Sequence, residues 1–74
     1  MVTVYSFVGK GKYKDNRIVI VVPDNGDPIS ITHYFPADNV CTEQTDYYPN
    51  NPISLRFEIA RIMSTGKFSI LSIE

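Results

Sequence analysis

Residues branched at Cβ dominate the apolar part of this chain. Valine and isoleucine together number 16, whereas alanine and leucine number only four, and threonine and tyrosine add five each. Cβ-branched and aromatic side chains suit the half-buried surface of a β-sheet and lose rotamer freedom in a helix. The five prolines and four glycines lie between the apolar runs, as turn residues do. The sequence therefore predicts an all-β fold in a single domain, residues 1–74.

The chain has little with which to cross-link so small a fold. A domain of 74 residues buries only about 60% of the surface of its unfolded chain. Its one cysteine excludes an intramolecular disulfide, and one cysteine with one histidine excludes a structural zinc site. We therefore expect no metal and no cofactor, and a compact β fold that associates as a homodimer.

Five segments have the alternation or the continuous apolar character of strands. The second and third are joined by a turn at Asn25-Gly26, a pair that supplies the positive φ values of a tight hairpin. Residues 36–52 hold three prolines and are expected to form a long surface loop. Five short antiparallel strands predict a small, partly closed barrel of OB-like or SH3-like type. The predicted strands are residues 2–8, 17–22, 29–35, 53–63 and 68–73.

The segment 53–63 fits two patterns. Its apolar residues at positions 53, 55, 57 and 59 alternate with smaller or more polar ones, which is the period of a strand. One helical stripe is also present, made of Leu55, Ile59, Ile62 and Met63, and Asn51-Pro52 is a typical helix start. A strand is favoured because the alternation is unbroken over eight residues, and a short helix near residues 53–63 is the alternative.

Charge is segregated along a chain whose net charge is −1. Residues 1–17 hold four lysines and arginines against one acid, and residues 53–74 hold three against two. Residues 18–52 hold five acids and no lysine or arginine. Both ends of the chain are therefore basic, and the middle is acidic.

Each basic part places an aromatic residue beside lysine. Tyr13 lies between Lys12 and Lys14, and Phe68 follows Lys67. Lysines neutralise phosphates and exposed rings stack on bases, so this pattern predicts single-stranded nucleic-acid binding with low sequence specificity. The alternative is a solvated loop without a ligand. The candidate binding residues are Lys10, Lys12, Tyr13, Lys14, Arg17, Lys67 and Phe68.

Two stretches of the chain resemble the filamentous-phage single-stranded-DNA-binding proteins. In the first, the Gly-Lys-Tyr of residues 11–13 precedes an apolar strand and an Asp-Asn-Gly-Asp turn. In the second, the Tyr-Pro of residues 48–49 and a β segment precede the Gly-Lys-Phe of residues 66–68. The resemblance implies an OB-like five-stranded barrel, a homodimer and cooperative coating of single-stranded DNA. It also implies stacking by Tyr13 and Phe68, with Lys12 and Lys67 near phosphates.

The acidic middle of the chain supports a second function. Tyrosines in a loop stiffened by proline offer a large contact area with little entropy to lose on binding. The alternative is a small protein-binding module, encoded by a phage or mobile element, that inhibits a host factor through the loop 38–52. Its candidate residues are Asp46, Tyr47 and Tyr48.

No set of residues predicts catalysis. His33, the only histidine, lies in an apolar strand, and Cys41 follows it by eight residues with nothing to pair them. Asp24 and Asp27 are explained by the hairpin turn better than by an incomplete calcium loop. We therefore expect a binding protein and not an enzyme.

Neither a membrane span nor a signal peptide is expected. The longest apolar run, residues 18–22, is far shorter than a bilayer requires, and the N-terminus lacks a basic segment followed by an apolar run. A lone cysteine favours a reducing compartment. The sequence therefore predicts a cytoplasmic protein, in the cytoplasm of the host cell if a phage encodes it.

Overall fold

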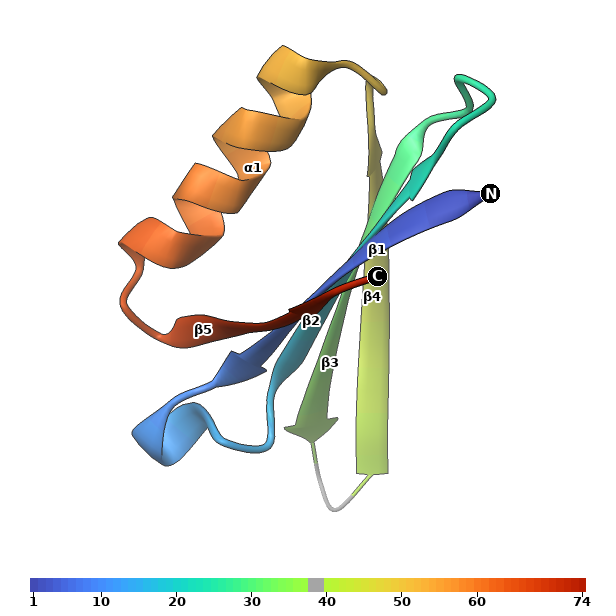
Figure 1. Ribbon diagram of the computed structural model, residues 1–74. Coiled ribbons are helices and arrows are strands. Elements are labelled where there is room, and N and C mark those ends of the chain that lie inside the picture. Colours follow the sequence, from blue (N-terminus) through green and yellow to red (C-terminus); the bar gives the residue numbers. More distant parts are fainter. Residues whose placement is uncertain (38–39) are drawn as a thin grey trace.

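One antiparallel sheet carries most of the chain (Figure 1). The computed structural model describes residues 1–37 and 40–74, and within them five strands lie in the order β4-β3-β2-β1-β5 with α1 across one face. The sheet stays open, with β4 and β5 at its edges, which confirms the predicted small antiparallel β fold in a partly open form. The elements are β1 (Val2–Gly9), the 3-10 turn η1 (Gly11–Tyr13), β2 (Arg17–Pro23), β3 (Ile29–Ala37), β4 (Val40–Tyr48), α1 (Pro52–Ser64) and β5 (Phe68–Ile73).

Four of the strands lie where the sequence predicts them, namely β1, β2, β3 and β5. The turn between β2 and β3 has the expected chemistry. Gly26 adopts a φ of 87°, and the Asn25 side chain accepts the backbone N–H of Asp27 at 3.1 Å. The local turn residues therefore determine this hairpin correctly.

The predicted loop over residues 36–52 is wrong, because Val40–Tyr48 forms β4. All nine residues of β4 pair with β3, and the hydroxyl groups of Thr32 and Thr45 share a hydrogen bond of 2.9 Å across the two strands. β4 is an edge strand with most of its side chains exposed, so a polar and acidic composition is compatible with its position. Residues 38 and 39, which belong to the predicted loop and to the predicted protein-binding segment, lie outside the described residues.

The strand favoured for residues 53–63 is also wrong, because Pro52–Ser64 forms the helix that was the alternative. Asn51 is its N-cap and accepts the Ser54 N–H at 2.8 Å, and a proline occupies the first helical position. Two apolar residues of the strand pattern face solvent, since Ile53 and Phe57 are 82% and 65% exposed. The capping residues and the helical stripe therefore outweigh the alternation.

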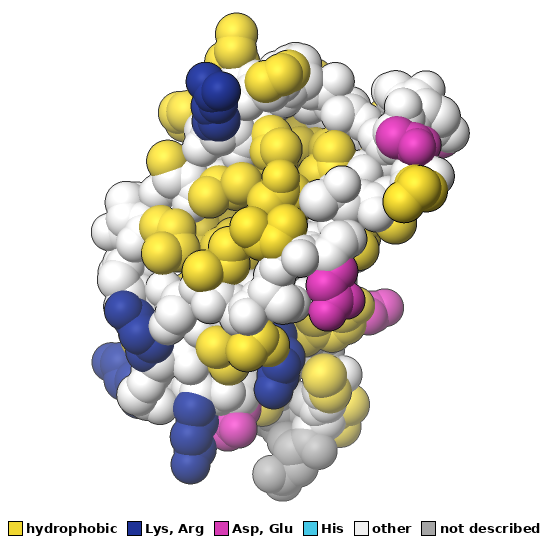
Figure 2. Space-filling view, in the orientation of Figure 1, with side chains coloured by type: hydrophobic (Ala, Val, Ile, Leu, Met, Phe, Trp, Pro, Cys, Tyr) yellow, Lys and Arg dark blue, Asp and Glu magenta, His cyan; other side chains and the backbone are white. Residues whose placement is uncertain are grey.

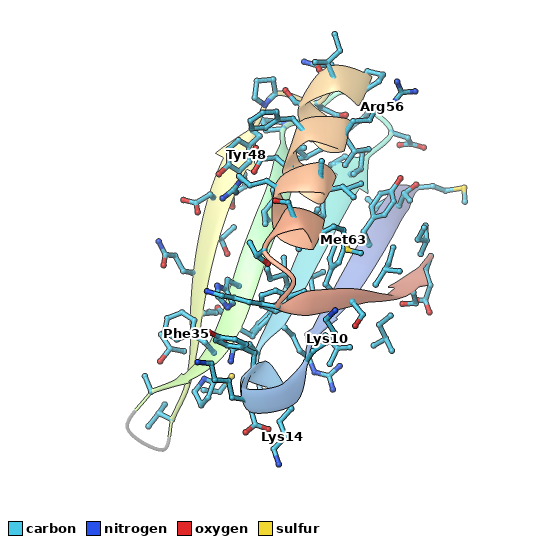
Figure 3. All side chains as sticks on the ribbon, turned by 90° about the vertical axis from the view of Figure 1, so that its left-hand side faces the viewer. Lys10, Lys14, Phe35, Tyr48, Arg56 and Met63 are labelled. Atoms are coloured by element: carbon cyan, nitrogen blue, oxygen red, sulfur yellow. The ribbon has the colours of Figure 1, made fainter. Side chains whose placement is uncertain are left out.

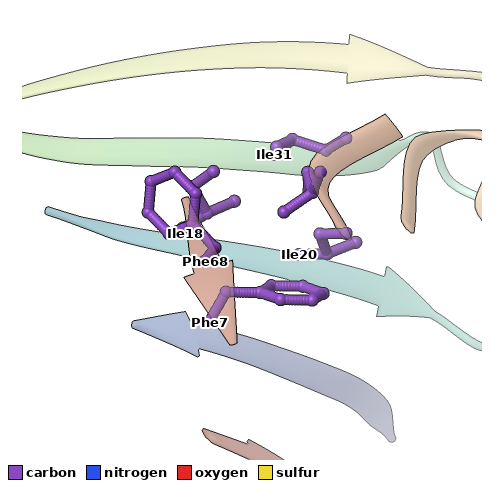
Figure 4. Close-up of a cluster of buried hydrophobic side chains, with 6 residues drawn as sticks. Phe7, Ile18, Ile20, Ile31 and Phe68 are labelled. Carbon is purple, nitrogen blue, oxygen red and sulfur yellow. The ribbon is translucent and has the colours of Figure 1, made fainter. Parts of the chain in front are cut away.

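The hydrophobic core lies between α1 and the central strands (Figure 4). Phe7 from β1 and Ile20 from β2 are the most deeply buried members, at 1% and 0% exposure. α1 contributes Ile62, and β5 contributes Phe68 from the far edge. The buried cluster consists of Phe7, Ile18, Ile20, Ile31, Ile62 and Phe68.

The connection from β4 through α1 to β5 crosses the whole width of the sheet. Strand pairing makes β4 and β5 parallel to each other at opposite edges. The turn that follows α1 is consequently brought beside the connection between β1 and β2 (Figure 1). Among the helices of residues 1–37 and 40–74, none has the length and apolar character of a membrane span.

Candidate nucleic-acid interface

Two basic segments that are far apart in the sequence meet at one end of the sheet. The backbone N–H of Lys10, between β1 and β2, donates to the carbonyl of Lys67, between α1 and β5, at 2.8 Å. The ammonium groups of Lys12 and Lys67 lie 5.3 and 5.0 Å from the centroid of the Tyr13 ring. The two predicted binding segments therefore form one surface. We define the basic cluster as Lys10, Lys12, Lys14, Arg17 and Lys67.

Close backbone packing positions Tyr13 in this surface. Gly9 donates its N–H to the Asn16 carbonyl at 2.9 Å, and Asn16 donates to the Tyr13 carbonyl at 2.8 Å. A Cβ on Gly9 would overlap the Tyr13 carbonyl oxygen and lie 2.6 Å from its carbonyl carbon. Only glycine at position 9 lets the connection fold back this closely.

All five side chains of the basic cluster are exposed. In Figure 2 most of the lysines and arginines gather at the end of the molecule where η1 and the start of β5 lie. Arg17 pairs with Val8 and Tyr34, and paired residues in a sheet point to the same face. For these three residues that face is the one away from α1, so Arg17 extends the group of cations to that side. Among the described residues, no member of the cluster forms an ion pair with a carboxylate. Its charges are therefore available to an anionic ligand.

Phe68 does not belong to this exposed surface. It is 6% exposed, lies opposite Gly9 in the sheet, and packs in the core. Its ring meets the ring of His33 edge to face at 5.9 Å between centroids. The predicted stacking role of Phe68 is incompatible with this packing, and the half-buried Tyr13 is the aromatic residue that accompanies the lysines.

A pocket of about 300 Å³ adjoins the basic cluster, at the C-terminal end of α1. Its apolar lining comes from β2, β3, β5 and α1, and its polar lining comes mainly from β4, α1 and the following turn. Lys67 lines the pocket and also contacts the Tyr13 ring, so the two features are continuous. The lining residues are Ile18, Ile31, His33, Gln44, Asp46, Tyr48, Arg61, Ile62, Thr65, Lys67 and Phe68.

Sequence patterns do not reveal this pocket. Gln44, Arg61 and Thr65 come from three separate segments and were not predicted as site residues. They come together only because β4 pairs with β3 and α1 crosses the sheet. No local motif marks such an arrangement.

Two polar side chains of the pocket are held by neighbours. His33 Nε2 lies 3.2 Å from Asn16 Oδ1, and burial lowers the pKa of His33, which favours its neutral ring. Arg61 donates through Nε and Nη2 to Glu58 Oε1 at 3.1 and 2.6 Å. This hydrogen bond, reinforced by the negative charges of Glu58 and Asp46, outweighs the opposing effect of partial burial and raises the pKa of Arg61, so its guanidinium stays charged.

The three predicted protein-binding residues do not share one surface. Tyr47 is 70% exposed on the face of the sheet away from α1, where it pairs with Ser30. Asp46 and Tyr48 lie on the α1 side of the sheet and line the pocket, and Tyr48 is seen beside α1 in Figure 3. Strand alternation therefore separates the two tyrosines, which a loop would have allowed to lie together.

His33 and Cys41 lie on opposite faces of the sheet. His33 pairs with Gln44, whereas Cys41, three residues earlier on β4, pairs with Pro36. This geometry keeps the thiol away from the imidazole. Within residues 1–37 and 40–74, no group of three or more His, Cys, Asp or Glu side chains could hold a metal ion.

In comparisons with known proteins, no family model, no curated protein and no solved structure matches this chain. Its function has to be inferred from the site itself.

Proposed function

We propose that this protein binds single-stranded nucleic acid, with low sequence specificity, through the basic cluster around Tyr13. The observation that carries the proposal is the convergence of Lys12 and Lys67 on one aromatic ring, at 5.3 and 5.0 Å. A ring flanked by two ammonium groups offers a base a stacking surface and its flanking phosphates two counter-charges.

The net charge of −1 does not oppose such binding at this end of the molecule. Asp24 and Asp27 follow the far end of β2, a seven-residue strand that begins at Arg17. A strand of that length spans about 20 Å, whereas charges in physiological salt are screened over about 8 Å. Nearer acids among the described residues are Asp15, beside Lys14, Glu43 on β4, and Asp46, which lines the pocket with Lys67. The five cations of the basic cluster outnumber these three carboxylates, so a phosphate beside the lysines experiences a net positive charge.

Base stacking on Tyr13 competes with the lysines that now lie near its ring. A cation–π contact at an exposed site contributes about 0.5–1 kcal/mol, whereas stacking of a base on an aromatic side chain contributes about 1–3 kcal/mol. A base can therefore displace one lysine from the ring. The displaced ammonium group then remains within reach of the adjacent phosphate.

Fluorescence anisotropy with a labelled single-stranded oligonucleotide tests the proposal. We expect Tyr13→Leu to weaken binding about tenfold through loss of stacking, and Lys12→Gln to weaken it by a smaller factor. Arg56→Gln is the matched control, because Arg56 is an exposed cation on α1, away from the cluster (Figure 3). Wild-type protein that does not bind at about 50 mM salt would overturn the proposal, as would equal losses in the Lys12 and Arg56 variants.

The second candidate function is a small protein-binding module, encoded by a phage or mobile element, that inhibits a host factor. The observation that favours it is the 70% exposure of Tyr47 on the edge strand β4, whose free edge can pair with a strand of a partner. A photo-crosslinking residue at position 47 tests this candidate. One defined protein adduct from position 47, and none from position 14, would support it, whereas no adduct at position 47 would count against it.

A further inference from the structure

The pocket beside the basic cluster has a lining suited to a flat heterocycle. Ile18 and Ile31 from the sheet, with Ile62 from α1, provide apolar walls, and the buried Phe68 ring lies at the same site. Its volume of about 300 Å³ is at the small end of the range for ligand pockets, roughly 300–1,000 Å³. A single ring system is therefore a better match than a larger ligand.

The rim of the pocket offers hydrogen-bonding groups of both kinds. Gln44 donates and accepts, Asp46 accepts, and Tyr48 donates or accepts. Among the described residues, none of these three side chains forms a hydrogen bond within the chain. Carboxylate and amide side chains of this type recognise the edges of nucleobases.

We propose that the pocket receives one unstacked nucleobase of a bound single strand, while the flanking phosphates contact the basic cluster. This inference rests on the proposed function and deepens it. Lys67 links the two parts, because it lines the pocket and lies 5.0 Å from the Tyr13 ring centroid. A strand that places one base on Tyr13 thus has a neighbouring position for another base.

Other ligand classes fit the lining less well. A lone phosphate would meet Lys67 and Arg61, but it would also face the carboxylate of Asp46 and leave the apolar walls uncovered. A purely aliphatic ligand would leave the polar rim unpaired. A nucleobase uses the apolar walls and both kinds of rim group together. The same chemistry is found in a free nucleotide, so the test has to separate a base within a strand from a base in solution.

The proposal is tested with a variant whose pocket is filled by a large side chain and with an oligonucleotide that lacks one base. Gln44→Trp places a large side chain at the pocket, and Thr45→Trp is the matched control, because Thr45 is an exposed, uncharged neighbour on the opposite face of β4. We expect Gln44→Trp to weaken binding of a normal oligonucleotide about tenfold and to change binding of an abasic oligonucleotide less than twofold. Thr45→Trp should change neither, and far-UV circular dichroism checks that both variants fold.

Three outcomes separate this inference from the proposed function. Equal affinities of wild type and Gln44→Trp for the normal oligonucleotide would overturn the base pocket and leave the proposed function standing. If the wild type binds no oligonucleotide, nucleoside monophosphates are added and the backbone amide resonances of Gln44 and Thr65 are followed by NMR. Shifts confined to the pocket would then support a site for a free base alone, whereas no shift would overturn the pocket as well.

Discussion

Replacing Gly9 with alanine is expected to destabilise the end of the sheet that carries the basic cluster. The new Cβ would overlap the Tyr13 carbonyl, which is backbone and cannot rotate away. Carbon atoms in ordinary contact are about 3.5–4.0 Å apart, whereas this Cβ would lie 2.6 Å from the Tyr13 carbonyl carbon. The connection must therefore retreat by about 1 Å or more.

That movement breaks the two hydrogen bonds that fold the connection back, from Gly9 to Asn16 and from Asn16 to Tyr13. At about 0.5–1.5 kcal/mol each, their loss lowers the free energy of unfolding by about 1–3 kcal/mol. A protein of this length is stable by only about 4–11 kcal/mol, and its urea dependence is about 1 kcal/mol per molar. The urea midpoint should therefore fall by about 1–3 M.

Gly11→Ala is the matched control for this prediction. Gly11 lies in the same connection and has a φ of 58°, but nothing lies within 4 Å of a Cβ added there. Its substitution meets only the left-handed backbone penalty, about 1–2 kcal/mol, and no steric overlap. Urea unfolding followed by far-UV circular dichroism compares the two variants. Tyr13 resonances in an NMR spectrum separate the two causes, because only Gly9→Ala should displace the Tyr13 backbone. The reasoning fails if Gly9→Ala is as stable as the wild type, or if its Tyr13 resonances move no more than those of Gly11→Ala.

Three further predictions concern the rest of the fold. Burial lowers the pKa of His33 below its ordinary value of 6.5, so the unfolded chain binds its proton first as pH falls. Stability should therefore decline below about pH 6.5, and urea titrations of His33→Gln should lack this part of the decline. Asn51→Ala removes the cap that accepts the Ser54 N–H at 2.8 Å and should lower the unfolding free energy by about 1 kcal/mol in urea titrations, whereas an unchanged midpoint would contradict the cap's role. Ile20→Ala empties a position with 0% exposure and should cost about 2–5 kcal/mol, and a loss below about 1 kcal/mol would contradict the assigned core.

The turn residues and apolar runs of the sequence predict much of this fold, because the tertiary structure uses the same turns and strands that these local patterns favour. The Asn25-Gly26 turn and the β-branched runs beside it encode the β2–β3 hairpin directly. β4 was missed because an edge strand needs no apolar face, so its composition resembles that of a loop. α1 was misassigned because Leu55 and Ile59 satisfy both periods, and only Ile62 and the helix start at Asn51-Pro52 favour the helix over the strand.

The candidate site was predictable in part for a similar reason. The sequence shows two basic segments, one with lysines beside Tyr13 and one with Lys67 before the last strand. That the two segments meet depends on the strand order, which the sequence pattern does not give. The burial of Phe68 follows from its register opposite Gly9, which no local pattern specifies. The pocket depends on the same long-range pairing.

The predicted homodimer remains a prediction. It rests on the small size of the chain, which limits the core that one copy can bury. Sedimentation equilibrium measures the mass directly, and a value near that of one 8.4 kDa chain at all accessible concentrations would contradict it.

The salt dependence of oligonucleotide binding tests the central claim most directly. If all five cations of the basic cluster contact phosphates, the slope of log K against log salt for a single strand is about −3.5. The Lys12→Gln/Lys67→Gln double variant should reduce its magnitude to about 2. Binding that is absent, or a slope that the double variant leaves unchanged, would contradict the assignment of this cluster as a nucleic-acid interface.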